Sequence, residues 1–256
     1  MMLKKRFIAV VTIKNSHAVQ SFGYNNYLPL GKPDVIVKNL DRWGVDEIIL
    51  QCIDRSSSNL GPDFEVLNKI SKIGISTPII YGGGIRNADD ASKVVSNGAD
   101  RILLDALLYS PKNELEIIAD KLGVQAIMAN IPIRQDGEYY LALNYQTKIE
   151  SKFNKFIDKI SLHLISEVLI TDWCNEGKKE SFNIKLLEIS DLIEKPLIFF
   201  GGISSKLTIN KILNNFKTVG FGIGNFLNYQ ENAVQKLKLN ISNQIIRPPY
   251  FHNEEY

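Results

Sequence analysis

The sequence predicts an α/β fold, a (β/α)8 TIM barrel in which eight parallel strands close on themselves. Three observations predict it: short apolar runs alternate with amphipathic helical stretches, the chain is long enough for such a barrel, and its two halves resemble each other. The 256 residues, 45% of them hydrophobic, can fill one large core. An open doubly wound sheet would show the same alternation, so the resemblance between the halves decides between the two folds.

The expected strands are runs rich in Ile, Val, Leu and Phe, the composition of strands buried on both faces. Helical patterns lie between them, as in 33–44, where Val35, Leu40 and Trp43 recur at helical spacing. Gly44 stands where that helix should stop. The eight expected strands span 7–13, 47–52, 78–82, 101–105, 124–130, 167–172, 196–201 and 219–224.

Two segments do not fit this alternation. The first loop, 14–32, is too long for an ordinary connection, and we expect it to cover a ligand at the C-terminal end of the barrel. The stretch 133–146 carries Asp136 and Gly137 between alternating runs, which predicts a β-hairpin.

An internal half-barrel repeat favours the closed barrel. Segment 78–108 reads like 196–227, and 44–55 reads like 165–176, with Glu47 matching Glu167. Two copies of a four-strand half make one closed eightfold barrel. We therefore expect a single barrel domain over 1–256 that ends in a tail from about residue 240.

The composition excludes several classes of function. A net charge of +2 gives no field that would favour nucleic acid or a membrane surface. The two cysteines, Cys52 and Cys174, have no CxxC spacing, and the three scattered histidines predict no metal centre. No apolar run is long enough for a secretory signal or a membrane span, so we expect a cytoplasmic protein. No cofactor is predicted.

Glycine-rich turns follow two expected strands that the repeat relates. Gly83-Gly84 ends the third strand and Gly201-Gly202 the seventh. Such a turn exposes backbone N–H groups and lets an anion approach closely, so with the next helix N-terminus it can hold a phosphate. Gly224-Asn225, after the eighth strand, faces the second turn. The alternative is that tight βα turns simply need glycine.

Acidic residues near strand ends are candidates for acid–base chemistry. Asp105, Asp172 and Glu176 are the available acids. An acid–base enzyme needs two such groups facing each other across the barrel mouth. Each of the three could instead cap a helix or pair with a nearby lysine.

Four charged residues start four different strands at the opposite end of the barrel: Arg6, Glu47, Arg101 and Glu167, here called the charged ring. Counting by twos from Arg6 leads to Thr12, so these two side chains share one face of the first strand. Charges that meet inside the barrel must pair, because unpaired they are costly to desolvate. The pattern fits either a gate at the entrance to an axial passage or a surface rim of unrelated ion pairs.

The order of these features resembles the cyclase subunit of imidazole glycerol phosphate synthase. The segments KKRFIAVVTIKN, GVDEIIL, YGGGIRN, NGADRILLD, DGEYY and FFGGI have counterparts there, from residue 4 to about 228. In that family a glutaminase docks on the N-terminal face of the barrel, and ammonia passes through the core to a phosphorylated substrate at the top. The resemblance implies an ammonia gate made of the charged ring, with Arg101 where the family commonly has lysine. It also matches Asp100 to an acid of the docking face.

The top of the barrel departs from the family. Thr12 and Asn130 lie near the positions of the two aspartates that carry the cyclase chemistry, and Gln20 replaces an expected lysine. Asp105 and Ala106 stand where the family has Asn and Thr donors to a phosphate, and a carboxylate there would repel an anion. The second phosphate site keeps its donors: Gly177, Gly202, Gly224 and Asn225.

We therefore expect a divergent paralogue that channels ammonia from a glutaminase to a separate amidotransferase acting on a surface-polysaccharide sugar. The first alternative is a cyclase of histidine synthesis that uses displaced acids such as Asp172 or Glu176. The second is a self-contained sugar-phosphate isomerase, which would also rely on two strand-end acids, so Thr12 disfavours it.

Overall fold

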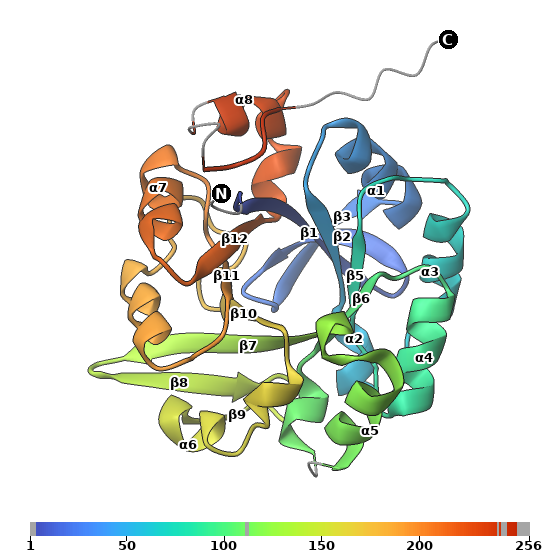
Figure 1. The fold of residues 1–256 in the computed structure, drawn as a ribbon. Coiled ribbons are helices and arrows are strands. Elements are labelled where there is room, and N and C mark those ends of the chain that lie inside the picture. Colours follow the sequence, from blue (N-terminus) through green and yellow to red (C-terminus); the bar gives the residue numbers. More distant parts are fainter. Residues whose placement is uncertain (1–3, 111–112, 240, 242–244, 250–256) are drawn as a thin grey trace.

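The computed structural model describes residues 4–110, 113–239, 241 and 245–249, and its parallel strands form the expected closed (β/α)8 barrel (Figure 1). Each strand pairs with the next, and β12 pairs back with β1 to close the ring. The strands are β1 (Arg6–Lys14), β4 (Glu47–Cys52), β5 (Ile79–Gly82), β6 (Arg101–Leu104), β7 (Ile127–Asp136), β10 (Glu167–Asp172), β11 (Leu197–Phe200) and β12 (Thr218–Ile223).

Helices cover the outside of the ring (Figure 1). Several begin at a side-chain cap, such as Asp63, Asn87 or Ser205, that accepts a backbone N–H of the first turn. The α-helices are α1 (Pro33–Arg42), α2 (Ile53–Ser57), α3 (Phe64–Ser71), α4 (Ala88–Ser96), α5 (Asn113–Leu122), α6 (Phe153–Ile157), α7 (Lys206–Asn214) and α8 (Ala233–Leu239). The 3-10 helices are η1 (Ala106–Tyr109), η2 (Val124–Ala126), η3 (Leu162–Leu164), η4 (Ile184–Asp191) and η5 (Asn225–Asn228). The connection after β10 is thus a 3-10 helix rather than a regular α-helix.

Two antiparallel additions extend the barrel at its C-terminal end. The first loop is itself a hairpin, β2 (His17–Phe22) and β3 (Asn26–Gly31), whose first strand pairs with the end of β1. The expected hairpin around Asp136 and Gly137 is confirmed, because β7 continues into β8 (Tyr139–Asn144). A further edge strand, β9 (Ile149–Lys152), follows it and pairs with β8.

One expected strand was placed too early in the chain. Residues 124–126 form η2, and the strand runs over 127–136 instead of 124–130. The hairpin explains the later end of the strand, since its hydrogen bonds to β8 extend β7 beyond the barrel wall.

Alternation along β1 separates two apolar layers. Phe7, Ala9 and Val11 belong to the large core between strands and helices, whereas Ile8 and Val10 belong to a smaller cluster on the barrel axis. In a parallel sheet, side chains in register point to the same face. The register therefore aligns the axial positions of β1 with those of β4.

Residues near both ends of the chain meet at the N-terminal end of the barrel. Lys5 pairs with Ile246 as an isolated bridge, and the Lys5 N–H donates to the Ile245 carbonyl at 2.8 Å. Most of the tail expected from about residue 240 lies outside the described residues. Among the described helices, none has the length and apolar content to cross a bilayer.

Candidate functional site at the two ends of the barrel

The charged ring at the foot of the barrel forms one connected network of ion pairs. Arg6 Nη1 lies 2.9 Å from Glu47 Oε1, and Arg6 Nη2 lies 2.7 Å from Glu167 Oε2. Arg101 Nη1 reaches the same Glu167 oxygen at 3.0 Å. The four side chains are only 11% to 17% exposed, so they face one another and not the solvent.

The network is asymmetric. Arg101 also donates to Ser166 Oγ at 2.7 Å and to the Gln125 carbonyl at 3.1 Å. Glu47 Oε2 is buried and has no hydrogen-bond partner among the described residues. Burial raises the pKa of Glu47 above its ordinary value, although the nearby Arg6 opposes this shift. Two arginines and two glutamates leave the charged ring with no net charge.

Above the charged ring, the barrel axis is filled by apolar side chains. Their cluster is separate from the larger core outside the strands. Its strand members are Ile8, Val10, Ile49, Ile80, Leu103, Met128, Leu169, Ile198 and Phe200. The axis is thus polar at the foot and apolar above it.

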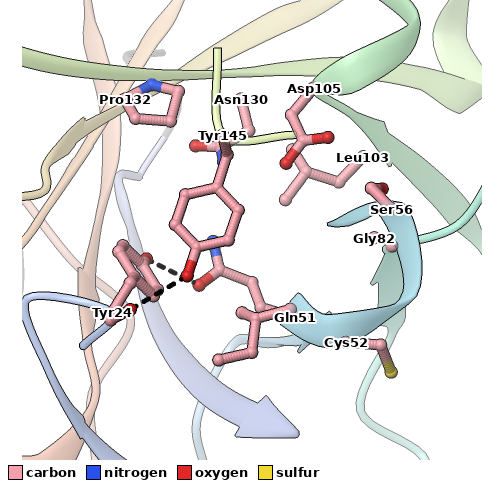
Figure 2. Close-up of a pocket in the computed structure, with 12 residues that line it drawn as sticks. Tyr24, Gln51, Cys52, Ser56, Gly82, Leu103, Asp105, Asn130, Pro132 and Tyr145 are labelled. Carbon is pink, nitrogen blue, oxygen red and sulfur yellow. Dashed lines mark hydrogen bonds between the residues drawn. The ribbon is translucent and has the colours of Figure 1, made fainter. Parts of the chain in front are cut away.

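A pocket lies at the C-terminal mouth, and two tyrosines from opposite hairpins meet in it (Figure 2). Tyr24, from the turn between β2 and β3, donates its hydroxyl to Gln51 Oε1 at 2.9 Å. Tyr145, from the turn between β8 and β9, packs edge-on against Tyr24 with ring centroids 5.3 Å apart. Its hydroxyl donates to the Tyr24 carbonyl at 3.1 Å. The expected cover over the mouth is therefore an aromatic pair, which sequence reasoning missed because neither tyrosine follows a barrel strand.

Of the three candidate acids, Asp105 lines this pocket, whereas Asp172 and Glu176 do not. Asp172 is buried, and its Oδ2 accepts from Asn175 Nδ2 at 2.9 Å and from the Asn183 N–H at 2.8 Å. Glu176 is buried, and its Oε2 accepts from Ser21 Oγ at 2.8 Å. Burial raises the pKa of both carboxyls. Asp172 thus braces its own loop, and Glu176 ties the β2–β3 hairpin to the loop after β10.

The two residues near the family's aspartate positions are also buried. Asn130 lines the mouth pocket, and its Oδ1 accepts from Thr171 Oγ1 at 2.7 Å. Thr12 pairs in register with Gln51, so it lies on the same face of β1 as Arg6, as the alternation predicts. Neither side chain is acidic, so no pair of strand-end carboxylates converges here.

The glycine-rich turns have the backbone conformation that favours glycine. The φ angles are +124° at Gly83, +71° at Gly84, +109° at Gly201 and +70° at Gly202. Gly177 also has a positive φ, +80°, and a Cβ there would lie 1.9 Å from the Ser21 carbonyl oxygen. These positions exclude side chains, as both the phosphate interpretation and the tight-turn interpretation require.

The structure brings the second-half residues together at one pocket. Gly177, Gly202, Gly224 and Asn225 all line it, together with Lys178 and Lys179, which sequence reasoning did not single out. The Asn225 amide has another role, since its Nδ2 donates to the Ser21 carbonyl at 2.7 Å. Gly201 does not line this pocket. It packs against the Asp172 backbone, where a Cβ would lie 2.4 Å from the carbonyl oxygen.

The fold and the two ends of the barrel define a class: a (β/α)8 barrel with repeat-related glycine turns at the top and buried ion pairs at the foot. Residues 6–232 match the family described as histidine biosynthesis protein, and the chain belongs to that family. A relative in Vibrio vulnificus, named putative imidazole glycerol phosphate synthase subunit hisF2, is 26% identical over 79% of this chain and 75% of its own. A Campylobacter jejuni protein of the same name is 28% identical, over 79% of this chain and 82% of its own. The Exiguobacterium imidazole glycerol phosphate synthase subunit HisF is 26% identical, over 78% of this chain and 80% of its own.

Proposed function

We propose that this barrel receives ammonia from a partner glutaminase at its N-terminal face and channels it for the amidation of a surface-polysaccharide sugar by a separate amidotransferase. The observation that carries the proposal is the contrast between the two ends. The charged ring at the foot is assembled and paired. The mouth lacks the two opposed acids that cyclase chemistry needs.

The charged ring suits an entrance for a small neutral molecule. Its four charges cancel, and Glu47 Oε2 offers a buried acceptor that the ring itself does not use. Ammonia can donate an N–H to such an oxygen. The apolar axial cluster above the ring favours neutral ammonia over ammonium, because desolvating a charge is costly. These side chains fill the axis, so passage requires some of them to rotate.

A phosphorylated ligand is the second part of the proposal. The turn that carries Gly202 has the backbone conformation that favours glycine, and Lys178 and Lys179 add positive charge to its pocket. Backbone N–H groups of such turns and nearby lysines are the usual donors to phosphate oxygens.

The alternative is a cyclase subunit of imidazole glycerol phosphate synthase in histidine biosynthesis. The names of the relatives favour it directly, and two of those relatives carry the paralogue name hisF2. It would require Asp172 or Glu176 to leave the hydrogen bonds that now hold them.

The test of ammonia transfer is reconstitution with the cognate glutaminase and amidotransferase. Product formed from glutamine is compared with product formed from ammonium chloride, which bypasses the barrel. Arg6→Met and Glu167→Gln should reduce the glutamine-dependent rate at least tenfold and leave the ammonium-dependent rate unchanged. Arg134→Met is the matched control, since Arg134 forms an equally close pair with Glu150, at 2.6 Å, away from the foot.

Two results would overturn this function. Full glutamine-dependent activity in both charged-ring variants would remove the ammonia gate. Growth without histidine, when the wild-type gene complements a strain lacking the cyclase, would favour the cyclase instead.

A further inference from the structure

The two halves of the barrel differ at their candidate phosphate sites. In each half a short 3-10 helix follows a strand, η1 after β6 and η5 after β12. The residue before η1 is Asp105, and the residue before η5 is Gly224. The repeat places these two residues at the same position, so one half carries a carboxylate where the other carries only a hydrogen atom.

In the first half, two N–H groups that could hold an anion are already engaged. Asp105 Oδ1 accepts a hydrogen bond from the N–H of Ala106, the first residue of η1. The N–H of Gly84 donates to Ser56 Oγ at 3.1 Å. Ser56, Gly84 and Ala106 line one surface pocket, so the protein itself occupies the donors on both sides of it.

The charges near this pocket also disfavour an anion. Arg86 is the cation in the lining of this pocket. The Arg86 guanidinium donates hydrogen bonds to the Asp90 carboxylate, through Nε at 2.8 Å and Nη2 at 3.2 Å. Asp105 lines the adjoining mouth pocket, as does Ser56 (Figure 2). A phosphate in the first-half turn would therefore lie near the Asp105 carboxylate of the adjoining pocket, and the cation in its own lining, Arg86, is already paired.

The second-half pocket, in contrast, has unengaged N–H donors and nearby positive charge. Within the described part of the chain, the N–H groups of Gly177 and Gly202 donate to no other group. Lys178 and Lys179 line their pocket. The one acid in its lining, Glu176, is held by Ser21 Oγ at 2.8 Å.

We propose that the mouth of this barrel binds a ligand with a single phosphate group, held by the turns of the second half. Asp105 acts as a built-in anion that excludes a second phosphate from the first half. The substrate class is therefore a phosphate monoester and not a bisphosphate. This inference rests on the proposed phosphate site but is independent of ammonia transfer.

The test counts bound phosphate directly. Crystals of the full chain are soaked in inorganic phosphate, and binding in solution is titrated by calorimetry. The wild type should bind one phosphate, against Gly177 and Gly202. Asp105→Asn should bind a second one at Gly84 and Ala106, and Asp105→Asn/Ala106→Thr should bind it more tightly. Asp136→Asn is the matched control, because it removes the same charge from an exposed position in the β7–β8 turn at the same end of the barrel.

A second measurement uses only the wild type, so it does not depend on whether the variants fold. The wild type should bind fructose 1,6-bisphosphate no more than about threefold more tightly than fructose 6-phosphate, since only one phosphate is seated. Two phosphates in the wild type, a tenfold preference for the bisphosphate, or one phosphate in both Asp105 variants would each overturn the inference. So would a second phosphate in Asp136→Asn. Absence of any bound phosphate would overturn the phosphate site too, while the glutamine-dependent assay would still decide ammonia transfer.

Discussion

Arg6 and Glu167 are 161 residues apart in the chain, and their side chains meet at 2.7 Å across the foot of the barrel. Their strands are not neighbours, since β1 pairs with β12 and β4, and β10 pairs with β7 and β11. The two side chains can meet only by pointing inward from separate parts of the wall. This contact makes the charged ring an internal feature of the barrel and not a surface rim.

Removal of Arg6 should destabilise the protein. Arg6→Met leaves Glu47 and Glu167 close together in a mostly buried place without their shared cation. Breaking a fully buried pair costs about 3–5 kcal/mol, and the partial exposure here reduces the expected loss to about 2 kcal/mol. Urea denaturation measures it. Lys69→Met, which removes an exposed pair with Glu65, should change the unfolding free energy by less than about 0.5 kcal/mol. Equal losses in the two variants would contradict the buried network.

The buried Glu176 should make stability depend on pH in a defined direction. Burial raises its pKa in the folded state, so the folded protein holds this proton more tightly than the unfolded chain. The corresponding stability is present below the unfolded pKa of about 4.3 and is lost as pH rises through the raised value. Glu176→Gln should therefore gain stability relative to wild type as pH rises above about 4.3, because the variant has no carboxyl to ionise. Unfolding curves at several pH values check this, and parallel profiles for the two proteins would refute it.

The Tyr24 hydroxyl should contribute to closing the mouth. Tyr24→Phe leaves the buried Gln51 Oε1 without its donor and should cost about 1 kcal/mol. Tyr229→Phe removes a similar bond to Gln20 Oε1, at 3.2 Å, from an exposed position and should cost almost nothing. Thermal unfolding compares the two variants. An unchanged midpoint in Tyr24→Phe would mean that water replaces the phenol.

Gly202 should tolerate a side chain less well than another glycine of similar conformation. Gly202 and Gly137 have φ angles of +70° and +60°, so alanine at either should cost about 1 kcal/mol in backbone strain. A Cβ at Gly202 would also lie 2.4 Å from Ser181 Oγ, whereas nothing lies within 4 Å at Gly137. Gly202→Ala should therefore lose about 1–3 kcal/mol more than Gly137→Ala, measured by chemical denaturation. Equal losses would show that the turn has room for a side chain.

The barrel could be predicted because its signals are local. Strand runs, helix stops and the half-barrel repeat depend on short segments, and the alternation of β1 alone places Arg6 and Thr12 on one face. Sequence reasoning failed where strands outside the eightfold pattern pair with a barrel strand. The hairpin at Asp136 and Gly137 moved the fifth barrel strand toward the C-terminus, and the first loop became a hairpin on the end of β1.

The features of the candidate site also divide into those that local sequence signals predict and those that depend on the tertiary structure. The sequence by itself determined which charged residues begin four of the strands and where glycines follow the strands, since strand periodicity follows from backbone geometry. Only the tertiary structure decided that Asp172 is bound by its own loop, that Glu176 is bound by Ser21 of the β2–β3 hairpin, and that Tyr24 and Tyr145 close the mouth. The hydrogen bonds of Glu176 to Ser21 and of Tyr145 to Tyr24 join segments far apart in the sequence, and closure of the ring brings them within reach.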